Sequence, residues 1–399
     1  MKLLTAVGAI LLSASVSAEI YFKEQFDENW ESRWTVASKW KSGSELGKWE
    51  RTAGEWYGDS SDMGIKTTEN HRFYGLSAPL AQTFNNKGKT LVLQYTVKHE
   101  QNIDCGGAYI KILPGGSDFD AQKFGGDSPY SVMFGPDVCG STRRTHVIFN
   151  YPPKDDNVLI TKDILCEKDN FSHMYRLVVQ PDNTFEVFID GKSVRHGKLE
   201  DEFNFLEEKE IKDPAVSKPE DWIDEKKIPD PNDVKPEGYD DISPEVPDSD
   251  ASKPEDWDDE DDGEWEPPMI PNPDYNGPWR QKQIDNPEYK GEWEHPIIPN
   301  PGYIKDDELY NRCVDCTHIG FEIWQVTAGT LFDDIILTDS IEEAQAFAEE
   351  TFYKKKDPEA AMKNKMDKEE NDKKAADKAE DENDGMTLDD IEDADGEEL

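Results

Sequence analysis

The sequence lacks a membrane-spanning segment and is poor in positive charge. After residue 18, no stretch approaches the about 20 consecutive apolar residues that a helix needs to cross a bilayer. The chain has 44 Lys and Arg against 88 Asp and Glu, which gives a formal net charge of −44. Nucleic acids and anionic membranes are polyanions, so we expect neither as a partner. Calcium or a basic protein would be attracted instead.

The patterns of catalytic sites are also missing. Of the seven His residues, His99, His146 and His173 lie in or beside strand-like runs without a nucleophile in a catalytic context. The glycines at 125–126 fit no phosphate-binding loop, and there is no EF-hand loop. We therefore expect a binding protein and not an enzyme.

Residues 1–18, MKLLTAVGAILLSASVSA, are typical of a cleavable secretory signal. They combine one Lys, a short apolar run and small residues before the cleavage point. We expect the mature protein to be soluble and to reside in a secretory lumen or outside the cell.

The strand-like runs predict a mainly β fold. Short segments rich in β-branched and aromatic residues are separated by turn sequences, which indicates a two-sheet sandwich. These segments are 90–98, 109–113, 130–134, 145–151, 158–162, 175–180, 184–189 and 193–196. Two further runs, 318–326 and 330–338, most simply complete the same sandwich. We therefore expect one domain from 19–206 and 305–339, interrupted by an insertion at 207–304.

The insertion holds two sets of tandem repeats. Lys-Pro-Glu recurs from Lys218 at spacings of 17 and 18, and Trp recurs every 14 residues from Trp265. Prolines remove backbone donors, so a helix or a central strand is disfavoured. Three units of one kind followed by three of another predict a hairpin that turns near 261–263. We expect the aromatic residue of each outgoing unit to pack against a partner Trp or Tyr; these residues are Trp222, Tyr239 and Trp257. The alternative is a disordered acidic linker.

The C-terminal segment, 340–399, begins with a helix signal. Ser340 can cap a helix whose apolar residues recur at helical spacing between Ile341 and Phe352. Beyond Lys354 there is no apolar stripe until 386–391. That part is predicted to be a solvated helix or disordered.

The five cysteines are expected to be structural, as is usual in secreted proteins. Cys105 and Cys139 flank the strands that carry Tyr109 and Tyr130, so we pair them.

The CxxC motif Cys313-Val-Asp-Cys316 has three possible interpretations: a local disulfide, a redox pair or half of a zinc site. The motif precedes a strand and has no second copy, which favours the disulfide. Cys166 is expected to be a buried free thiol, and Asn170-Phe171-Ser172 is an N-glycosylation sequon.

Several long motifs make the chain resemble the calreticulin/calnexin family. They are YFKEQF at 21–26, KHEQNIDCGGAYIK at 98–111, MFGPDVCG at 133–140, HVIFNY at 146–151, SKPEDW and DGEWEPP. The resemblance implies a legume-lectin-like jelly-roll sandwich, an extended proline-rich arm and a C-terminal helix with an acidic tail. It also implies a calcium-binding lectin chaperone of the endoplasmic reticulum.

A site for a neutral sugar needs aromatic faces and a few fixed polar groups. The resemblance implies that terminal glucose of a monoglucosylated high-mannose glycan is bound by Tyr109, Lys111, Tyr130, Met133, Asp137, Glu322 and Trp324. The family has an Asp at the position of Glu322, whose longer side chain can still accept a hydroxyl hydrogen bond. The alternative is that these are ordinary residues of a strand face.

The resemblance further implies a structural calcium site. Its ligands would be Gln25, the backbone carbonyls of Ser61 and Met63, and the carboxylate of Asp333. Bulk calcium would bind the acidic tail. Lys residues at 354–356 and 373–374 dilute that tail, so we expect a reduced calcium capacity.

The resemblance also implies that the tip of the arm docks a thiol oxidoreductase of the disulfide-isomerase class. Its residues are Glu260, Asp262, Glu264 and Trp265, an acidic surface with one aromatic anchor that suits a basic patch. The alternative is a solvated turn. Other expected partners are glycoproteins and unfolded polypeptides, and we expect a monomer.

The last residues of the chain bear on its location. The final residues, Asp-Gly-Glu-Glu-Leu, share only Glu-Leu with the usual four-residue retrieval signal. The alternative to a resident chaperone is therefore a secreted calcium-binding interaction protein, immunomodulatory towards host or extracellular proteins.

Overall fold

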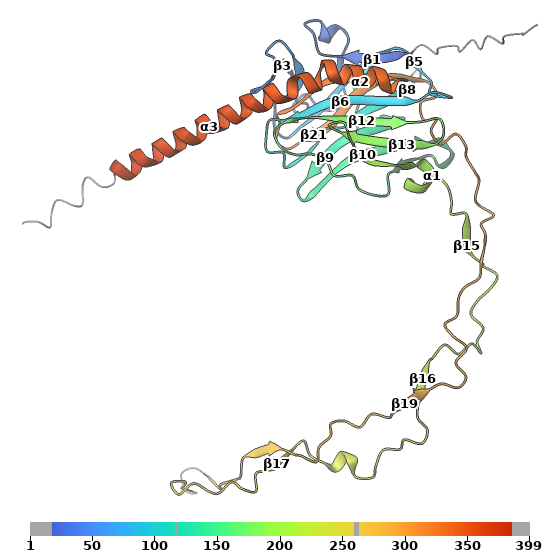
Figure 1. The fold of residues 1–399 in the computed structure, drawn as a ribbon, viewed down its shortest axis with the longest axis vertical. Helices are drawn as coiled ribbons and strands as arrows, with labels where there is room; N and C mark the ends of the chain where they lie inside the picture. The colour runs from blue at the N-terminus through green and yellow to red at the C-terminus, as the bar shows by residue number, and fades with distance from the viewer. Residues whose placement is uncertain (1–17, 117, 259–262, 385–399) are drawn as a thin grey trace, which may run out of the picture. The chain divides into compact units, whose positions relative to one another are not determined.

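The computed structural model describes residues 18–116, 118–258 and 263–384. The chain forms two compact units, one from residues up to Glu207 together with those from Tyr303 onward, the other from Glu208–Gly302. The signal segment predicted at 1–18 falls, except for its last residue, outside the described part. Figure 1 shows the two large sheets and the helices of the first unit.

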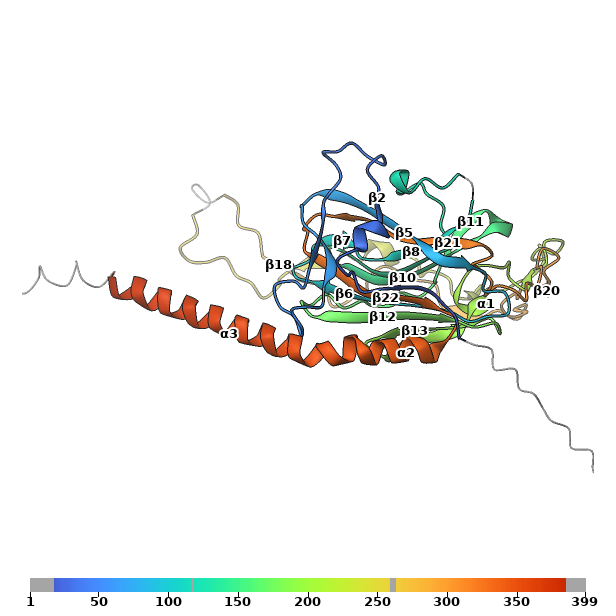
Figure 2. The same cartoon turned by 90° about the horizontal axis from the view of Figure 1, so that it is seen from above.

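The first unit is a sandwich of two antiparallel eight-stranded sheets, which confirms the predicted mainly β fold. Figure 2 shows the sheets as two layers, with α2 and α3 against the layer that holds β12 and β13. That layer has the order β14-β13-β12-β6-β22-β4-β3, and β1 also pairs with β22. Its strands are β1 (Ile20–Glu24), β3 (Trp49–Thr52), β4 (Gly64–Thr67), β6 (Leu91–His99), β12 (Ser172–Val179), β13 (Thr184–Ile189), β14 (Lys192–Lys198) and β22 (Thr330–Thr338).

The second layer has the order β11-β10-β9-β7-β21-β5-β2, and β8 lies between β9 and β21. Its strands are β2 (Thr35–Val36), β5 (Arg72–Phe84), β7 (Cys105–Gly107), β8 (Ile110–Pro114), β9 (Val132–Cys139), β10 (Thr142–Tyr151), β11 (Asp156–Leu159) and β21 (Cys316–Gln325). The late strands β21 and β22 are thus interior strands of the two sheets. Neither sheet is continuous until the chain has returned from the arm.

The core lies between the layers and follows the alternation of the strands. In β13 every second residue is buried, whereas all residues of β6 are buried. The second face of β6 is covered by α2 (Ile341–Glu350), where Val92 packs with Ala344 and Phe347. With both faces covered, β6 buries polar residues such as Gln94, Thr96 and Lys98 as well as its apolar ones.

The C-terminal helices begin as predicted. The Ser340 hydroxyl accepts a hydrogen bond from the backbone N–H of Glu343, which caps α2. Thr351 leaves the helical conformation, and α3 (Phe352–Asp384) follows at once. Of the two states predicted beyond Lys354, the structure has the helix up to Asp384. The remaining elements are short: α1 (Leu199–Glu202), η1 (Trp30–Ser32), η2 (Ala121–Lys123), η3 (Pro152–Lys154) and η4 (Tyr239–Asp241).

The second unit is a hairpin in which each outgoing repeat meets a returning one. Three antiparallel pairs of three-residue strands join its limbs. They are β15 (Glu210–Lys212) with β20 (Ile297–Pro299), β16 (Lys227–Pro229) with β19 (Gln283–Asp285), and β17 (Glu245–Pro247) with β18 (Met269–Pro271).

The aromatic residues of the outgoing repeats donate hydrogen bonds to glycine carbonyls, and among the described residues no ring contact joins them to the expected Trp or Tyr. Trp222 Nε1 donates to the carbonyl of Gly291 at 2.9 Å, and Tyr239 Oη donates to that of Gly277 at 3.0 Å. Trp257 repeats the contact with Gly263. The three glycines have φ of +94°, +80° and +85°, a conformation that costs other residues energy. These carbonyls therefore satisfy the polar groups of rings that have no large core around them.

Candidate sugar-binding and cation sites

The predicted sugar-binding residues converge on one face of the second sheet. Lys111 on β8 lies opposite Met133 on β9 and Gly320 on β21. Since side chains alternate along a strand, Asp137 shares this face with Met133, and Glu322 and Trp324 share it with Gly320. The intervening residues of these strands, Ile110, Phe134 and Ile323 among them, are fully buried in the core.

A buried ion pair stands at the centre of this face. Lys111 Nζ lies 2.6 Å from Glu322 Oε2, and the two residues are only 3% and 8% exposed. The same ammonium lies 4.8 Å from the centroid of the Tyr130 ring and 5.9 Å from that of Tyr109. Two aromatic rings and one charge pair are therefore gathered within reach of one small ligand. Glu322 is long enough to bridge to Lys111.

The electrostatics keep the phenol of Tyr109 protonated. Burial raises the pKa of Tyr109, and the negative charges of Glu322 and Asp137 raise it further. Burial likewise raises the pKa of Tyr130, with Glu322 again contributing. Near neutral pH both side chains retain an O–H that can donate to a ligand oxygen.

Two neighbouring residues, which were not among the predicted sugar-binding residues, hold the outer parts of this face in place. His146 Nε2 lies 3.3 Å from Asp137 Oδ2, and its ring packs edge-on against Tyr109 at 5.9 Å between centroids. Phe73 on β5 packs against Trp324 with centroids 4.6 Å apart. The HVIFNY motif contained His146, but only the register of β9 and β10 places it beside Asp137.

Both predicted cysteine pairs form disulfides. Cys105–Cys139 joins β7 to β9 at a directly opposed pair of residues. The Gly107–Asp137 pair lies two residues further along these strands, and Asp137 is one of the predicted sugar-binding residues, whose shared face is called here the sugar face. Cys313–Cys316 is a local bridge whose cysteines are fully buried, as the first of its three interpretations predicted. Cys166 is a buried free thiol, and burial raises its pKa to about 11, so it is not a thiolate near neutral pH.

A second polar site lies where the first sheet meets α3. Asp62, Asp333 and Asp334, called here the acidic trio, offer carboxylate oxygens that all lie within 4.8 Å of one another. Asp62 comes from the loop before β4, and the other two are consecutive residues of β22. A register shift follows Asp333, and Asp334 has a φ of +51°. This bulge lets two neighbouring carboxylates reach the same site, which a regular strand forbids.

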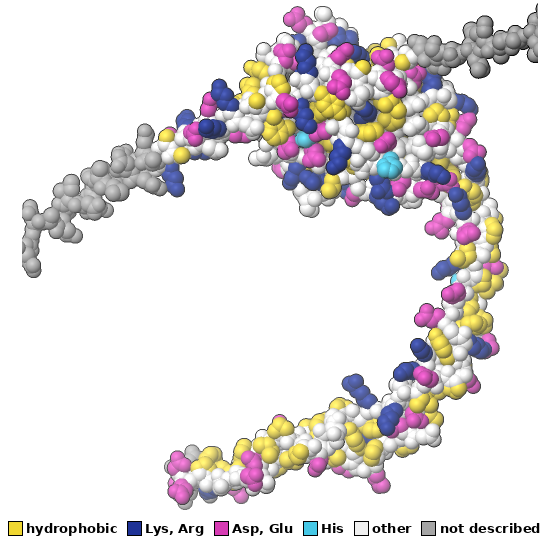
Figure 3. Space-filling view, viewed as in Figure 1, with side chains coloured by type: hydrophobic (Ala, Val, Ile, Leu, Met, Phe, Trp, Pro, Cys, Tyr) yellow, Lys and Arg dark blue, Asp and Glu magenta, His cyan; other side chains and the backbone are white. Residues whose placement is uncertain are grey.

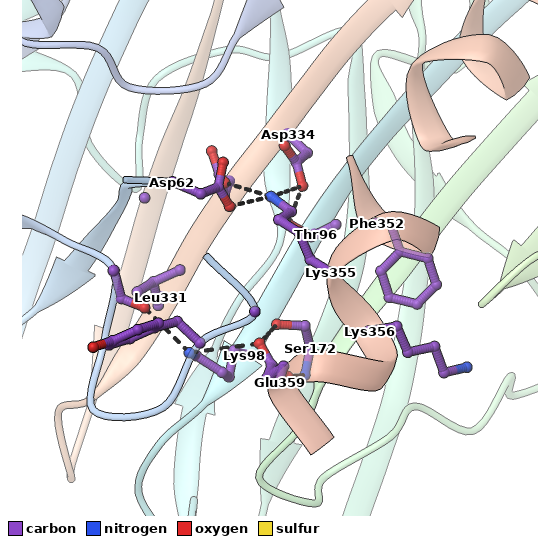
Figure 4. A pocket seen from close by; sticks show the side chains of 15 residues that line it. Asp62, Thr96, Lys98, Ser172, Leu331, Asp334, Phe352, Lys355, Lys356 and Glu359 are labelled. Atoms are coloured by element: carbon purple, nitrogen blue, oxygen red, sulfur yellow. Dashed lines mark hydrogen bonds and ion pairs between the residues drawn. The ribbon is translucent and has the colours of Figure 1, made fainter. Parts of the chain in front are cut away.

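The acidic trio carries more negative charge than its partner balances. Burial and the charge of Asp334 raise the pKa of Asp333 well above its ordinary value, and burial raises that of Asp334 to about 6. Lys355 from α3 places Nζ 2.8 Å from Asp334 and 3.3 Å from Asp333, and also contacts Asp62 (Figure 4). The Oδ1 atoms of Asp333 and Asp334 have no hydrogen-bond partner.

The donor set fits a hard cation such as calcium, which prefers several oxygen ligands. Among the predicted ligands, Asp333 belongs to the acidic trio, and Ser61 and Met63 flank Asp62 in the same loop. Gln25 follows the last residue of β1, where that strand pairs with β22 beside the bulge. Sequence reasoning missed Asp62 and Asp334.

At the tip of the arm, Glu264 is exposed and Trp265 is half-buried. Glu260 and Asp262 lie outside the described residues, as do the acidic tail from residue 385 and the final Glu-Leu.

The sandwich, its polar face with aromatic residues and the inserted proline-rich hairpin define a lectin-like class of protein. Comparison with known proteins gives the family: a model described as the calreticulin family matches residues 22–262 and 260–337. The chain belongs to the calreticulin family.

Two relatives and one solved structure support the same family. A calreticulin of Chlamydomonas reinhardtii is 57% identical over 366 residues, which cover 91% of this chain and 86% of that protein. A calreticulin of Caenorhabditis elegans is 55% identical over 360 residues, which cover 90% and 89%. The solved structure of the T. cruzi calreticulin globular domain is 30% identical, with a TM-score of 0.62, and covers 88% of this chain and 99% of that one.

Family membership supports the functional class that the motifs predicted, a calcium-binding lectin chaperone of the endoplasmic reticulum. In the part of the chain that the structure describes, no helix is long and apolar enough to cross a membrane.

Proposed function

We propose that this protein binds glycoproteins in the lumen of the endoplasmic reticulum through the terminal glucose of monoglucosylated high-mannose glycans. The observation that carries the proposal is the buried Lys111–Glu322 pair beside the rings of Tyr109 and Tyr130. Such a face combines the apolar surface and the fixed polar groups that a sugar ring needs.

Each residue of the face has a distinct proposed role. The rings of Tyr109, Tyr130 and Trp324 would cover C–H surfaces of the sugar. Lys111 would donate to a hydroxyl, held in place by Glu322, whose second oxygen would accept from another. Asp137, oriented by its contact with His146, would accept a further hydroxyl hydrogen bond. No bond is made or broken in this scheme, so retention of a client depends only on binding and release.

Calcium is proposed as the resident cation. The acidic trio would supply carboxylate ligands, and the loop around Ser61 and Met63 would supply backbone carbonyls. Calcium bound there would neutralise buried carboxylates that otherwise repel one another.

The arm is proposed to recruit a thiol oxidoreductase. Figure 3 shows Asp and Glu side chains gathered at the end of the arm. Glu264 and Trp265 follow the turn of the hairpin in sequence. An acidic surface with an aromatic anchor suits a basic partner and gives salt-sensitive association. Unchanged affinity for a disulfide-isomerase-class protein in a Trp265→Ala, Glu264→Lys double variant would refute docking at this tip.

Calorimetric titration tests the lectin proposal. The full mature chain, with calcium, is titrated with a monoglucosylated high-mannose oligosaccharide and with its unglucosylated form. We expect binding of the glucosylated sugar alone, and its loss in Tyr109→Ala. Tyr289→Ala, a change of the same kind at an exposed residue of the arm, serves as the matched control and should bind normally. Absence of binding by the folded wild-type chain would contradict the proposal.

A further inference from the structure

Two polar side chains attach α3 to the first sheet. Lys355 and Glu359, one helical turn apart, both point into a cavity of about 30 Å³ between α3 and the strands (Figure 4). Lys355 reaches the acidic trio. Glu359 accepts hydrogen bonds of 2.7 Å from the backbone N–H and the hydroxyl of Ser172, and lies 3.7 Å from Lys98 Nζ.

The ammonium of Lys355 occupies the position that a metal ion would take. Oxygens on opposite sides of a calcium ion are about 4.6–5.2 Å apart, because each bond measures about 2.3–2.6 Å. The oxygens of the acidic trio lie within 4.8 Å of one another, and Lys355 Nζ contacts all three carboxylates.

The remaining space is too small for both cations. About 30 Å³ holds one or two water molecules, and not a calcium ion with its shell of ligands beside the lysine head. One ammonium also leaves two buried oxygens unpartnered, Asp333 Oδ1 and Asp334 Oδ1, although these residues are only 4% and 1% exposed. A divalent ion can accept more oxygen ligands than an ammonium can donate hydrogen bonds.

We propose that the ammonium of Lys355 and a calcium ion are alternative occupants of the acidic trio, so that calcium binding loosens the attachment of α3 to the sandwich. The inference rests on the calcium site of the proposed function and adds Lys355 as a residue that competes with calcium at that site. By linkage the effect is reciprocal, because whatever holds α3 in place weakens calcium binding by the same factor.

The other anchors of α3 confine the change to its first turns. Phe352 remains buried against Met174 and Ala348, and Glu359 remains on Ser172. Calcium should therefore loosen the helix around Lys355 without releasing its start.

The affinity test compares the wild-type chain with Lys355→Gln. Calcium is titrated into each by calorimetry, and an Asp333→Asn variant identifies the heat that belongs to this site and not to the acidic tail. We expect Lys355→Gln to bind calcium about ten- to a hundredfold more tightly at this site, the factor that one charge-assisted hydrogen bond represents. Lys354→Gln makes the same charge change on an exposed neighbour and should stay within about twofold of wild type.

The attachment test follows amide hydrogen exchange of α3. Calcium should raise exchange around residues 354–358 of the wild-type chain, and should have no such effect in Lys355→Gln. This measurement on the wild type needs no variant, so it decides the question even if a substitution prevents folding. Magnesium, which demands a smaller octahedral shell, serves as the control ion and should act more weakly.

Three results would overturn the inference: equal calcium affinity in wild type and Lys355→Gln, no calcium heat that Asp333→Asn removes in either, or unchanged exchange of α3 with calcium. Sugar titration on the same samples separates the two proposals. With normal sugar binding, equal calcium affinity or unchanged exchange of α3 rejects the coupling alone, whereas missing calcium heat at this site rejects the proposed calcium site as well. Absent sugar binding with the expected calcium results rejects the lectin function alone.

Discussion

His173 gives a prediction whose sign and size both follow from the structure. On β12 its Nδ1 lies 2.8 Å from Asp190 Oδ2, and its Nε2 lies 2.8 Å from Asp169 Oδ1. Burial opposes a charge on the ring, but the two carboxylates outweigh it and raise the pKa from 6.5 to about 9. The imidazole is therefore held between two acceptors as an imidazolium.

This shift links stability to pH. The folded-state pKa lies above the unfolded-state value, so the stabilisation is complete below pH 6.5 and is lost as the pH rises towards 9. The difference between the two pKa values corresponds to about 3 kcal/mol of unfolding free energy.

Urea unfolding of His173→Gln and wild type, at about pH 6 and about pH 9.5, measures the effect. We expect the variant to be less stable by up to about 3 kcal/mol at the lower pH and by far less at the higher one. His196→Gln, the same change at an exposed site on β14, should differ from wild type by no more than about 0.5 kcal/mol at either pH. An equal penalty for His173→Gln at both pH values would refute the reasoning.

Three further predictions concern single contacts. Glu322→Gln leaves the buried ammonium of Lys111 without its counter-ion, so it should abolish sugar binding and lower the unfolding free energy by about 3–5 kcal/mol in urea titration. Glu322→Asp keeps the charge and should retain measurable sugar affinity. Full sugar binding by Glu322→Gln would contradict this role. Gly277→Ala forces a Cβ onto a residue with φ of +80°, at about 1–2 kcal/mol, and should speed amide exchange in that part of the arm only. The side-chain nitrogen of Asn170 donates to the backbone carbonyl of His99 at 2.8 Å. Because a glycan would be attached to that nitrogen, the mass spectrum of the secretory-pathway product should show the sequon unmodified.

Local sequence patterns were sufficient to predict those helices and strands whose conformation follows from their own residues. The run at 184–189 alternates buried and half-buried side chains and forms β13, and 330–338 forms β22. Ser340 caps α2 because a hydroxyl and the helix start adjoin in sequence. Tandem repeats at fixed spacing likewise predicted a hairpin arm, since matched units can pair in only one order.

The longest strand escaped prediction. β5 has 13 residues, but Gly75, Ser77, Ala78 and Pro79 give them little β propensity. Its extended conformation comes from pairing with β21, more than 200 residues further along the chain. No local window contains that partner.

The sequence by itself determined which residues form the proposed sugar-binding face, because strand alternation and long family motifs single out Tyr109, Lys111 and Glu322 without reference to distant contacts. The acidic trio was decided only by the tertiary structure. A bulge turned Asp334 to the side of Asp333, and a distant loop brought Asp62. The docking of α3 half-buried Lys355, one of three adjacent lysines that composition assigns to solvent. Which of several like charges becomes buried depends on packing between elements, and packing is not a local property of the chain.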